Sequence, residues 1–262
     1  MNRFSRATLV LLTLCCIGLA VSIYHRSPST VKAQGYCQAG CEGSFNCDNG
    51  PYCDSNGNWV CPGSPILVDV LGNGFSLTDA ADGVYFDIRN RGVKDLVSWT
   101  ANGSDDAWLA LDRNGNGRID GVAELFGDAT PQPQPPVGQS RNGFLALAVF
   151  DQPSEGGNSD GVIDAHDSVF ARLRLWRDQT RNGVSEPGEL LSLAASGVRA
   201  ISLDYKESKR VDEYGNRFRF RSRLSTSAAS DVGKWAWDVF LKVITVQTSS
   251  TASRNPQQVM AH

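Results

Sequence analysis

Short stretches with an apolar, strand-forming pattern recur along this 262-residue chain, and turn-forming Gly, Asn or Asp residues lie between them. In the clearest of these stretches apolar and polar residues alternate, which places every second side chain on one face and is typical of β-strands. A turn at Tyr214 and Gly215 would pair two of them. The pattern predicts strands at 65–71, 84–88, 198–205, 216–224 and 234–246, with the third and fourth paired.

Other stretches have features of short helices. Ser104 is a favoured N-cap residue, and Asp105 and Asp106 stabilise a helix N-terminus electrostatically. We therefore predict a short helix that begins at Ser104, and further short helices at 122–126, 142–150, 168–176 and 189–195. Together the two patterns predict an α+β fold, in which short helices flank acidic loops and pack with small antiparallel β-hairpins.

The most informative stretch is 112–127, where Asp and Asn recur at alternate positions. Gly117 lies where a calcium-binding loop bends sharply, because a residue without Cβ adopts that conformation without strain. A bidentate Glu normally stands at the twelfth position, and here Glu124 comes one residue later, which indicates a slightly stretched loop. An Asn/Gly-rich turn is the alternative. The predicted Ca²⁺ ligands are Asp112, Asn114, Asn116, the carbonyl of Arg118, Asp120 and Glu124.

Two later stretches repeat this arrangement of oxygen-bearing side chains around a central Gly. The second loop fits if five residues are inserted after its first ligand, and the third has the usual length. Ten residues separate these two loops, too few for the two helices of an ordinary EF-hand pair, so one short segment must serve both. The predicted ligands are Asp151, Asn158, Asp160, Asp164 and Asp167 in the second loop, and Asp178, Thr180, Asn182, the carbonyl of Val184, Glu186 and Glu189 in the third.

A fourth frame begins at Asp87 and has Arg89 and Arg91 where the main loop has Asn. Gly92 and Asp95 keep the positions of the bend and of a ligand. We interpret this stretch as a loop that has lost its calcium site, in which a guanidinium occupies the cation's neighbourhood. A plain hairpin turn is the alternative.

The first 33 residues form a targeting segment. Arg3 and Arg6 precede an apolar run at 7–24, and 31–33 suit a signal peptidase. An uncleaved membrane anchor is the alternative, since the run is long; on either interpretation the protein is exported, to the cell surface or the medium. The predicted divisions are 1–33 as signal peptide or anchor, 34–63 as a Cys-rich segment, 64–246 as the calcium-binding domain and 247–262 as a disordered tail.

The Cys-rich segment contains five cysteines and no Cys-x-x-Cys pair, which weakens a zinc interpretation. In an oxidising compartment disulfides are expected, because so short a segment cannot stabilise itself by burial. Five is an odd number, so two bridges and one free or intermolecular thiol would follow. The candidates are Cys37, Cys41, Cys47, Cys53 and Cys61.

Composition narrows the classes of function. The net charge of −3 argues against a nucleic-acid partner and against a polybasic membrane surface. We expect the protein to contact a membrane only through an uncleaved N-terminal leader. The three histidines, His25, His166 and His262, offer no Ser-His or Cys-His pair and no zinc-protease motif. Most carboxylates are better explained as cation ligands. We therefore expect no enzymatic activity, with a carboxylate-dependent hydrolase as the alternative.

The main loop and its continuation resemble a known class of sequence. The run from Asp112 to Asp120, followed by Glu124-Leu-Phe-Gly, is similar to an EF-hand-like calcium-binding segment that recurs in exported bacterial surface and haemolysin-type proteins. The resemblance covers roughly residues 65–222 and implies calcium binding without an agreed biochemical activity. The Cys-rich segment and the Trp-rich end lie outside it.

Two functions compete on this evidence. In the first, Ca²⁺ stabilises a structural or adhesive module that contacts a cell-surface protein or polysaccharide. In the second, the chain is a dockerin-like binding module, although the segments that follow its loops are unlike one another. Two features bear on a partner. Arg217, Arg219 and Arg221 would form one face of a strand, which is either solvated or binds an anionic polysaccharide. We expect Trp235 and Trp237 to pack in the core more than to stack on sugars.

Overall fold

The computed structural model describes residues 52–53, 59–60, 63–90, 92–135, 140–227 and 234–244. Contacts divide the chain into one unit of residues 1–45 and 52–59 and another of 46–51 and 60–262. The strands β1 (Tyr52–Cys53) and β2 (Trp59–Val60) pair with each other. The predicted leader, the C-terminal tail and the side chains of the Cys-rich segment lie outside the described residues. The structural description that follows concerns the second unit.

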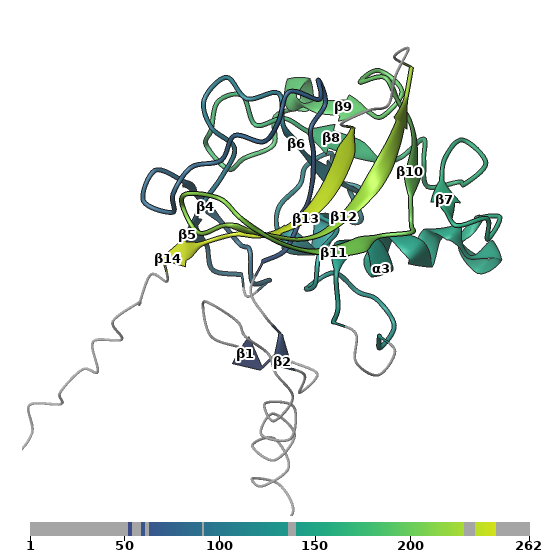
Figure 1. Cartoon of the computed structure of the whole chain (residues 1–262), viewed down its shortest axis with the longest axis horizontal. Helices are drawn as coiled ribbons and strands as arrows, with labels where there is room; N and C mark the ends of the chain where they lie inside the picture. The colour runs from purple at the N-terminus through teal and green to yellow at the C-terminus, as the bar shows by residue number, and fades with distance from the viewer. Residues whose placement is uncertain are drawn as a thin grey trace, which may run out of the picture. The chain divides into compact units, whose positions relative to one another are not determined.

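A nine-stranded antiparallel sheet forms the centre of this unit (Figure 1). Its strand order is β7-β10-β12-β13-β3-β6-β8-β9, and β11 pairs with β12 beside this path. The strands are β3 (Ile66–Val68), β6 (Ala107–Ala110), β7 (Val162–Ile163), β8 (Arg174–Trp176), β9 (Leu190–Ser192), β10 (Val198–Ser202), β11 (Lys206–Val211), β12 (Arg217–Thr226) and β13 (Trp235–Phe240).

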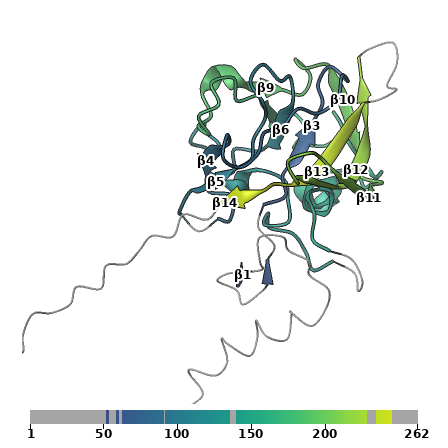
Figure 2. The ribbon, with the colours of Figure 1, turned by 60° about the vertical axis from the view of Figure 1, so that its left-hand side comes forward.

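A second sheet has the order β14-β5-β4, formed by Val243–Ile244, Asp95–Val97 and Val84–Phe86 (Figure 2). The one α-helix in the described part of the chain is α3 (Gly143–Ala148). Short 3₁₀ turns complete the fold: η1 (Val122–Glu124), η2 (Val149–Asp151), η3 (Pro153–Glu155) and η4 (Pro187–Glu189). None of the helical segments in the described ranges has the length and apolar character of a membrane span.

The core has two layers, one on each face of the central strands. Alternate residues of β3 point to opposite layers: Ile66 and Val68 join one apolar cluster and Leu67 joins the other. The first cluster includes Phe144 and other residues of α3, whereas the second includes β4 and β5 side chains such as Phe86. The central strands are therefore buried on both faces, which explains why they are continuously apolar.

The prediction of an α+β fold is wrong, because the described chain is mainly β. The predicted helix at Ser104 does not form: Ser104 Oγ instead donates to the Asp106 carboxylate, and the chain enters the fully buried strand β6. The predicted helices at 168–176 and 189–195 contain β8 and β9, which pair with each other. A short apolar run suits a buried strand or a buried helix equally well, and here pairing with distant strands selects the strand.

Several local predictions are confirmed. The helix at 142–150 begins at Gly143, and the Asn142 side chain caps it by accepting hydrogen bonds from the Phe144 and Leu145 backbone N–H groups. Strands form within all five predicted stretches, and β10 pairs with β12 as expected, but the turn at Tyr214 and Gly215 joins β12 to β11 and not to β10. The segment predicted as a helix at 122–126 is reduced to the single turn η1.

Candidate cation-binding loops

Each of the three predicted loops begins with an Asp whose carboxylate accepts hydrogen bonds from the loop's own backbone. In the first loop, Asp112 Oδ1 accepts from the N–H of Gly115 at 2.7 Å and of Asn116 at 3.2 Å, and Oδ2 accepts from Gly117 N–H at 2.8 Å. Gly117 has a φ of 80°, in the left-handed region that glycine adopts without strain. The loop therefore wraps around its first carboxylate.

The other two loops repeat this geometry. Asp178 Oδ2 accepts from Gly183 N–H at 2.9 Å, and Asp151 Oδ2 accepts from Gly161 N–H at 3.1 Å. Both glycines also have a left-handed φ, 66° and 81° respectively. The second loop reaches this arrangement although its chain is longer, because η3 takes up the inserted residues.

A carboxylate at the end of each loop turns back and closes it. Glu124 accepts from Asp120 N–H at 2.8 Å, Glu189 from Glu186 N–H at 3.3 Å, and Asp167 from Asp164 N–H at 2.8 Å. In all three loops the donor is the ninth position of the predicted frame. The one-residue displacement of Glu124 therefore does not prevent closure of the first loop.

Asn side chains inside the loops donate hydrogen bonds to other carboxylates of the same loops. The Asn116 amide donates to Asp120, the Asn182 amide to Glu186 at 2.9 Å and the Asn158 amide to Asp160 at 2.8 Å. Asn114 and Thr180 complete the set, since Asn114 Oδ1 accepts from Asn116 N–H and Thr180 Oγ1 donates to Asp178 Oδ1. Each amide oxygen in turn accepts a hydrogen bond from the backbone two residues later: Asn116 Oδ1 accepts from Arg118 N–H, and Asn182 Oδ1 accepts from Val184 N–H.

Two observations bear on whether a cation fits. Among the described residues, no three His, Cys, Asp or Glu side chains converge closely enough to form a metal cluster by themselves. Two carboxylate oxygens in the loops, Asp167 Oδ1 and Glu186 Oε2, are buried and accept no hydrogen bond. The available donors are carboxylate, amide, hydroxyl and carbonyl oxygens, and hard oxygen sets of this mixed kind suit Ca²⁺ more than Zn²⁺. The donor chemistry therefore fits calcium. Amide, hydroxyl and carbonyl oxygens would have to complete the coordination shell, because the carboxylates alone do not.

The third loop is anchored to the aromatic core. Trp99 Nε1–H donates to Asp178 Oδ2 at 2.9 Å, and Trp176 Nε1–H donates to Glu189 Oε2 at 3.3 Å. The two indole rings contact each other, with centroids 5.4 Å apart. The first and last carboxylates of this loop are thus held by side chains that also form the core, so their positions are coupled to core packing.

The Glu189 and Glu186 carboxylates influence each other. Burial and then the neighbouring Glu186 carboxylate raise the pKa of Glu189. The hydrogen bond from the Asn182 amide contributes most to lowering the pKa of Glu186. Two carboxylates held side by side in this way gain from a nearby cation, because it removes their mutual repulsion.

The third loop contacts the first, which the sequence did not indicate. The second and third loops were expected to share one short segment, and strand β8 does lie between them. The third loop, however, contacts the first: Ile119 N–H donates to Ser185 Oγ at 2.6 Å, across 66 residues of sequence. The second loop instead contributes β7, which pairs with β10. Sequence spacing could not reveal this, since the contact depends on the order of strands in the sheet.

The frame that begins at Asp87 keeps part of the loop geometry. Gly92 N–H donates to Asp87 Oδ2 at 2.7 Å, and the φ of Gly92 is 70°. The Arg89 guanidinium lies 3.3 Å from Asp95 Oδ2, and both side chains are buried. A guanidinium therefore occupies the interior of this loop, beside the carboxylate at its ninth position.

A further turn of the same form was missed in the sequence. Asp69 accepts from the N–H groups of Gly72, Asn73 and Gly74 at 2.6, 3.2 and 2.8 Å. Asp105 lies across this turn and accepts from Leu71 N–H and from the Asn73 amide. The sequence signal for this turn is an Asp that stands five residues before a Gly. The loops that begin at Asp87, Asp112 and Asp178 have the same spacing, and the loop that begins at Asp151 has it with five inserted residues.

A buried acidic pair also escaped the sequence analysis. Asp128 and Asp238 are 3% and 0% exposed, and their carboxylates influence each other electrostatically. Ser64 N–H donates to Asp128 Oδ1 at 3.1 Å, and Ser64 Oγ accepts from Asp128 N–H at 2.9 Å. Burial raises the pKa of Asp128 to about 6 and that of Asp238 well above its usual range. Asp128 and Asp238 are far apart along the chain, and neither stands in a motif that marks a functional site. Only the fold brings them together.

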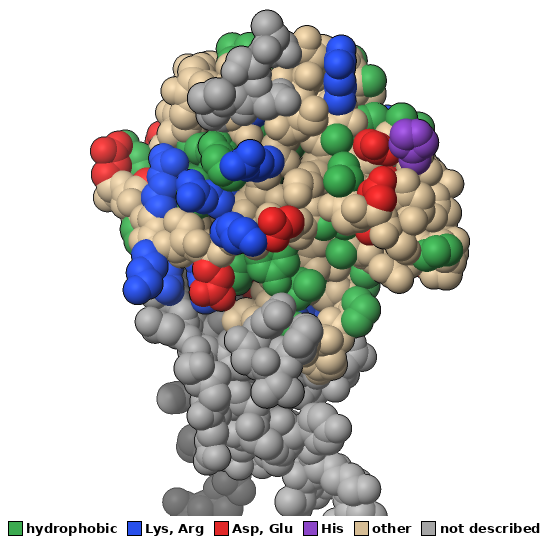
Figure 3. All heavy atoms as spheres, turned by 45° about the vertical axis from the view of Figure 1, so that its right-hand side comes forward, with side chains coloured by type: hydrophobic (Ala, Val, Ile, Leu, Met, Phe, Trp, Pro, Cys, Tyr) green, Lys and Arg blue, Asp and Glu red, His purple; other side chains and the backbone are tan. Residues whose placement is uncertain are grey.

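The arginines of β12 are engaged with aromatic rings. Arg221 lies 4.7 Å from the ring centroid of Trp235 and 5.4 Å from that of Trp237, and Arg219 lies 5.4 Å from that of Phe240. Trp237 is only 4% exposed and packs in the core, which the sequence favoured. Figure 3 shows Lys and Arg side chains gathered over one part of the surface, with hydrophobic side chains among them.

Comparison with known proteins finds a relative that is similar to part of this chain. The chain is similar to the iron-regulated protein FrpA of Neisseria meningitidis serogroup C, with 36% identity over 154 residues. That match covers 58% of this chain and 13% of the relative, so the chain spans a small part of the relative's length.

The resemblance to an EF-hand-like family is not supported, because the family that matches is described as the SPM domain and not as an EF-hand or calcium-binding family. The reason for the error is that similar spacing in short Asp- and Gly-rich loops arises on unrelated folds, here between β-strands instead of helices. The match covers residues 66–241, almost all of the described structure, and the chain belongs to the SPM domain family.

Proposed function

We propose that this is an exported calcium-binding protein, in which Ca²⁺ holds the loops 112–124, 151–167 and 178–189 and thereby stabilises a secreted or cell-surface module. The observation that carries the proposal is the geometry shared by the loops. Each has a first carboxylate bound by the N–H of a left-handed glycine and a terminal carboxylate that closes the loop. Export is supported by the basic and apolar pattern of residues 1–33.

A structural role for calcium is favoured over a sensing role. Sensor EF-hands respond to calcium by opening a pair of helices. The first loop here follows β6, the second contains β7, and the third lies between β8 and β9. Ca²⁺ at these places would fix connections of a sheet, and the described residues offer no helix pair that could open.

The two alternatives have less support. A dockerin-like module needs a recognition helix after each loop, whereas the first loop ends in the single turn η1 and the third is followed directly by strand β9. A carboxylate-dependent hydrolase needs an accessible acidic pair, and Asp128 and Asp238 are buried. A partner, if the module is adhesive, would be a cell-surface protein or polysaccharide, and the Lys- and Arg-rich surface of Figure 3 is the first place to test.

The test is removal of calcium from the full chain. Extracellular modules need dissociation constants of only about 10⁻⁴–10⁻³ M, and a site filled to a hundred times its dissociation constant adds about 2.7 kcal/mol to stability. Several such sites are comparable with the stability of a small domain, roughly 5–15 kcal/mol. We expect excess EDTA to lower the melting temperature by more than about ten degrees and to expose residues 100–200 to protease. Equal melting and protease resistance without calcium would exclude a structural role.

A further inference from the structure

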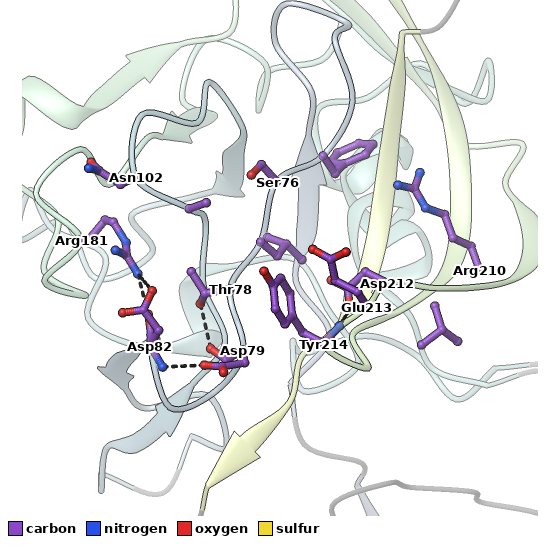
Figure 4. A pocket seen from close by; sticks show the side chains of 14 residues that line it. Ser76, Thr78, Asp79, Asp82, Asn102, Arg181, Arg210, Asp212, Glu213 and Tyr214 are labelled. Carbon is purple, nitrogen blue, oxygen red and sulfur yellow. Dashed lines mark hydrogen bonds and ion pairs between the residues drawn. The ribbon is translucent and has the colours of Figure 1, made fainter.

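A cavity of about 590 Å³ adjoins loop 178–189 through Arg181 and is lined by none of the predicted calcium ligands (Figure 4). Four separate segments form it: residues 75–79 with Asp82, residues 101–102, Arg181 and residues 210–214. Its volume is typical of pockets that bind small molecules and exceeds what a single ion requires. Figure 4 shows Arg181 and Arg210 at opposite sides of it, with carboxylates and the Tyr214 ring between them.

Arg210 provides a cation that has no ion-pair partner in the described part of the chain. Its guanidinium carbon lies 4.5 Å from the ring centroid of Phe218, 5.6 Å from that of Trp237 and 5.8 Å from that of Phe75. Within the described residues no carboxylate forms an ion pair with it. Three rings thus hold the guanidinium by cation–π contacts and leave its N–H groups available to a ligand.

The other arginine and most of the carboxylates are already occupied. Arg181 donates to the Asp82 backbone carbonyl and to Asp82 Oδ2, and its own backbone has a left-handed φ of 52°. Asp212 accepts from the backbone and the amide of Asn216. Part of the hydrogen-bonding capacity of Arg181, Asp82 and Asp212 is therefore already used within the protein, and a ligand has only their remaining donors and acceptors.

The remaining groups suit a polyhydroxyl ligand. Asp79 Oδ1 accepts from Asp82 N–H, which leaves its second oxygen for a hydroxyl donor. Asn102 is exposed and has no side-chain hydrogen bond within the described residues, so its amide can both donate and accept. Phe75 and Tyr214 offer ring faces, on which the C–H groups of a sugar can lie.

The charge of the lining argues against ionic ligands. Four carboxylates and two guanidiniums line the cavity, and Asp82 and Arg181 neutralise each other. The three carboxylates that are left outnumber Arg210 and would repel an anion, and Arg210 would repel a cation only at its own end of the cavity. A neutral ligand with many hydroxyl groups meets neither penalty, because it can donate to the carboxylates and accept from Arg210.

From these observations we propose that the cavity is a binding site for a neutral saccharide, held between the Arg210 guanidinium, the Asn102 amide and the rings of Phe75 and Tyr214. The site does not depend on the calcium proposal, since none of the predicted calcium ligands lines it. It lies on one unit of the protein and is formed by described residues only.

The test uses the full chain and a panel of neutral disaccharides, namely maltose, lactose, cellobiose and chitobiose, with saturation-transfer NMR to detect binding and titration to measure affinity. We expect at least one of them to bind, and we expect Arg210→Gln, Asn102→Ala and Tyr214→Ala each to weaken it by about tenfold, the loss that one removed contact of about 1.4 kcal/mol produces. Lys209→Gln is the matched control, because it removes the same charge from the adjacent exposed position of β11.

Melting curves of all four variants establish that the fold is intact, and the Asn102 variant gives a reliable answer even if Arg210→Gln disturbs its aromatic neighbours. The proposal is overturned if no neutral disaccharide binds, or if binding is unchanged in the three pocket variants. Binding confined to a hexuronate-containing disaccharide or to an oligolysine peptide would also overturn it, since either result would mean that charge selects the ligand.

Discussion

Replacement of Asp128 by Asn should change how the stability of the fold depends on pH. Asp128 is almost fully buried, its Oδ1 accepts from Ser64 N–H at 3.1 Å, and its Oδ2 is buried without a partner. Burial raises the pKa of this carboxyl from 3.8 to about 6 in the folded protein. Asn is nearly isosteric, keeps the acceptor for Ser64 and has no charge to bury.

The sign follows from proton linkage. The pKa of Asp128 is higher in the folded than in the unfolded chain, so the folded state holds the proton more tightly. Its favourable contribution is complete below pH 3.8 and is lost as the pH rises through 6. A shift of 2.2 pKa units, from 3.8 to 6, corresponds to about 3 kcal/mol in the free energy of unfolding. For a domain of this size that is a shift in melting temperature of about 6–12 °C.

The assay is thermal melting of the wild-type protein and the Asp128→Asn variant between pH 4 and pH 7.5, in excess EDTA so that calcium does not contribute. Because part of the contribution is already lost at pH 4, we expect the melting temperature of the variant to rise relative to that of the wild type by about 5–10 °C between pH 4 and pH 7.5. The comparison cancels Asp106, whose pKa burial raises to about 7 in both proteins. Asp204→Asn, at an exposed ion pair with Lys206, is the control and should show no such gain. A constant difference between Asp128→Asn and wild type at all pH values would refute the reasoning.

Three further changes test other parts of the structure. Glu189→Gln removes the carboxylate that closes the third loop and should weaken one calcium site most; calorimetry with unchanged affinity and stoichiometry would contradict the loop assignment. Gly183→Ala should destabilise the fold more than Gly161→Ala, because both have a left-handed φ but a Cβ at Gly183 would lie 2.8 Å from the Tyr85 carbonyl, and equal urea midpoints would argue against this. In the exported protein most of the five cysteines between Cys37 and Cys61 should be oxidised, so a thiol count of four or more in that segment without reduction would exclude the disulfide prediction.

The sequence by itself determined the local features of this protein. The spacing of Asp, Asn and Gly located the three loops and their closing carboxylates, because a tight loop depends on residues within about a dozen positions of each other. The alternation of apolar residues located the strands at the ends of the domain, and Asn142 marked the start of α3.

Only the tertiary structure decided which distant segments meet. The apolar run of β6 became a strand because β3 and β8 pair with it on either side, and no residue within the run specifies that. The contact of Ile119 with Ser185, the burial of Asp128 beside Asp238 and the position of Arg210 over three rings from other segments all follow from the same strand order. Such contacts join residues that are far apart along the chain, and they form only after the sheet has brought their strands together.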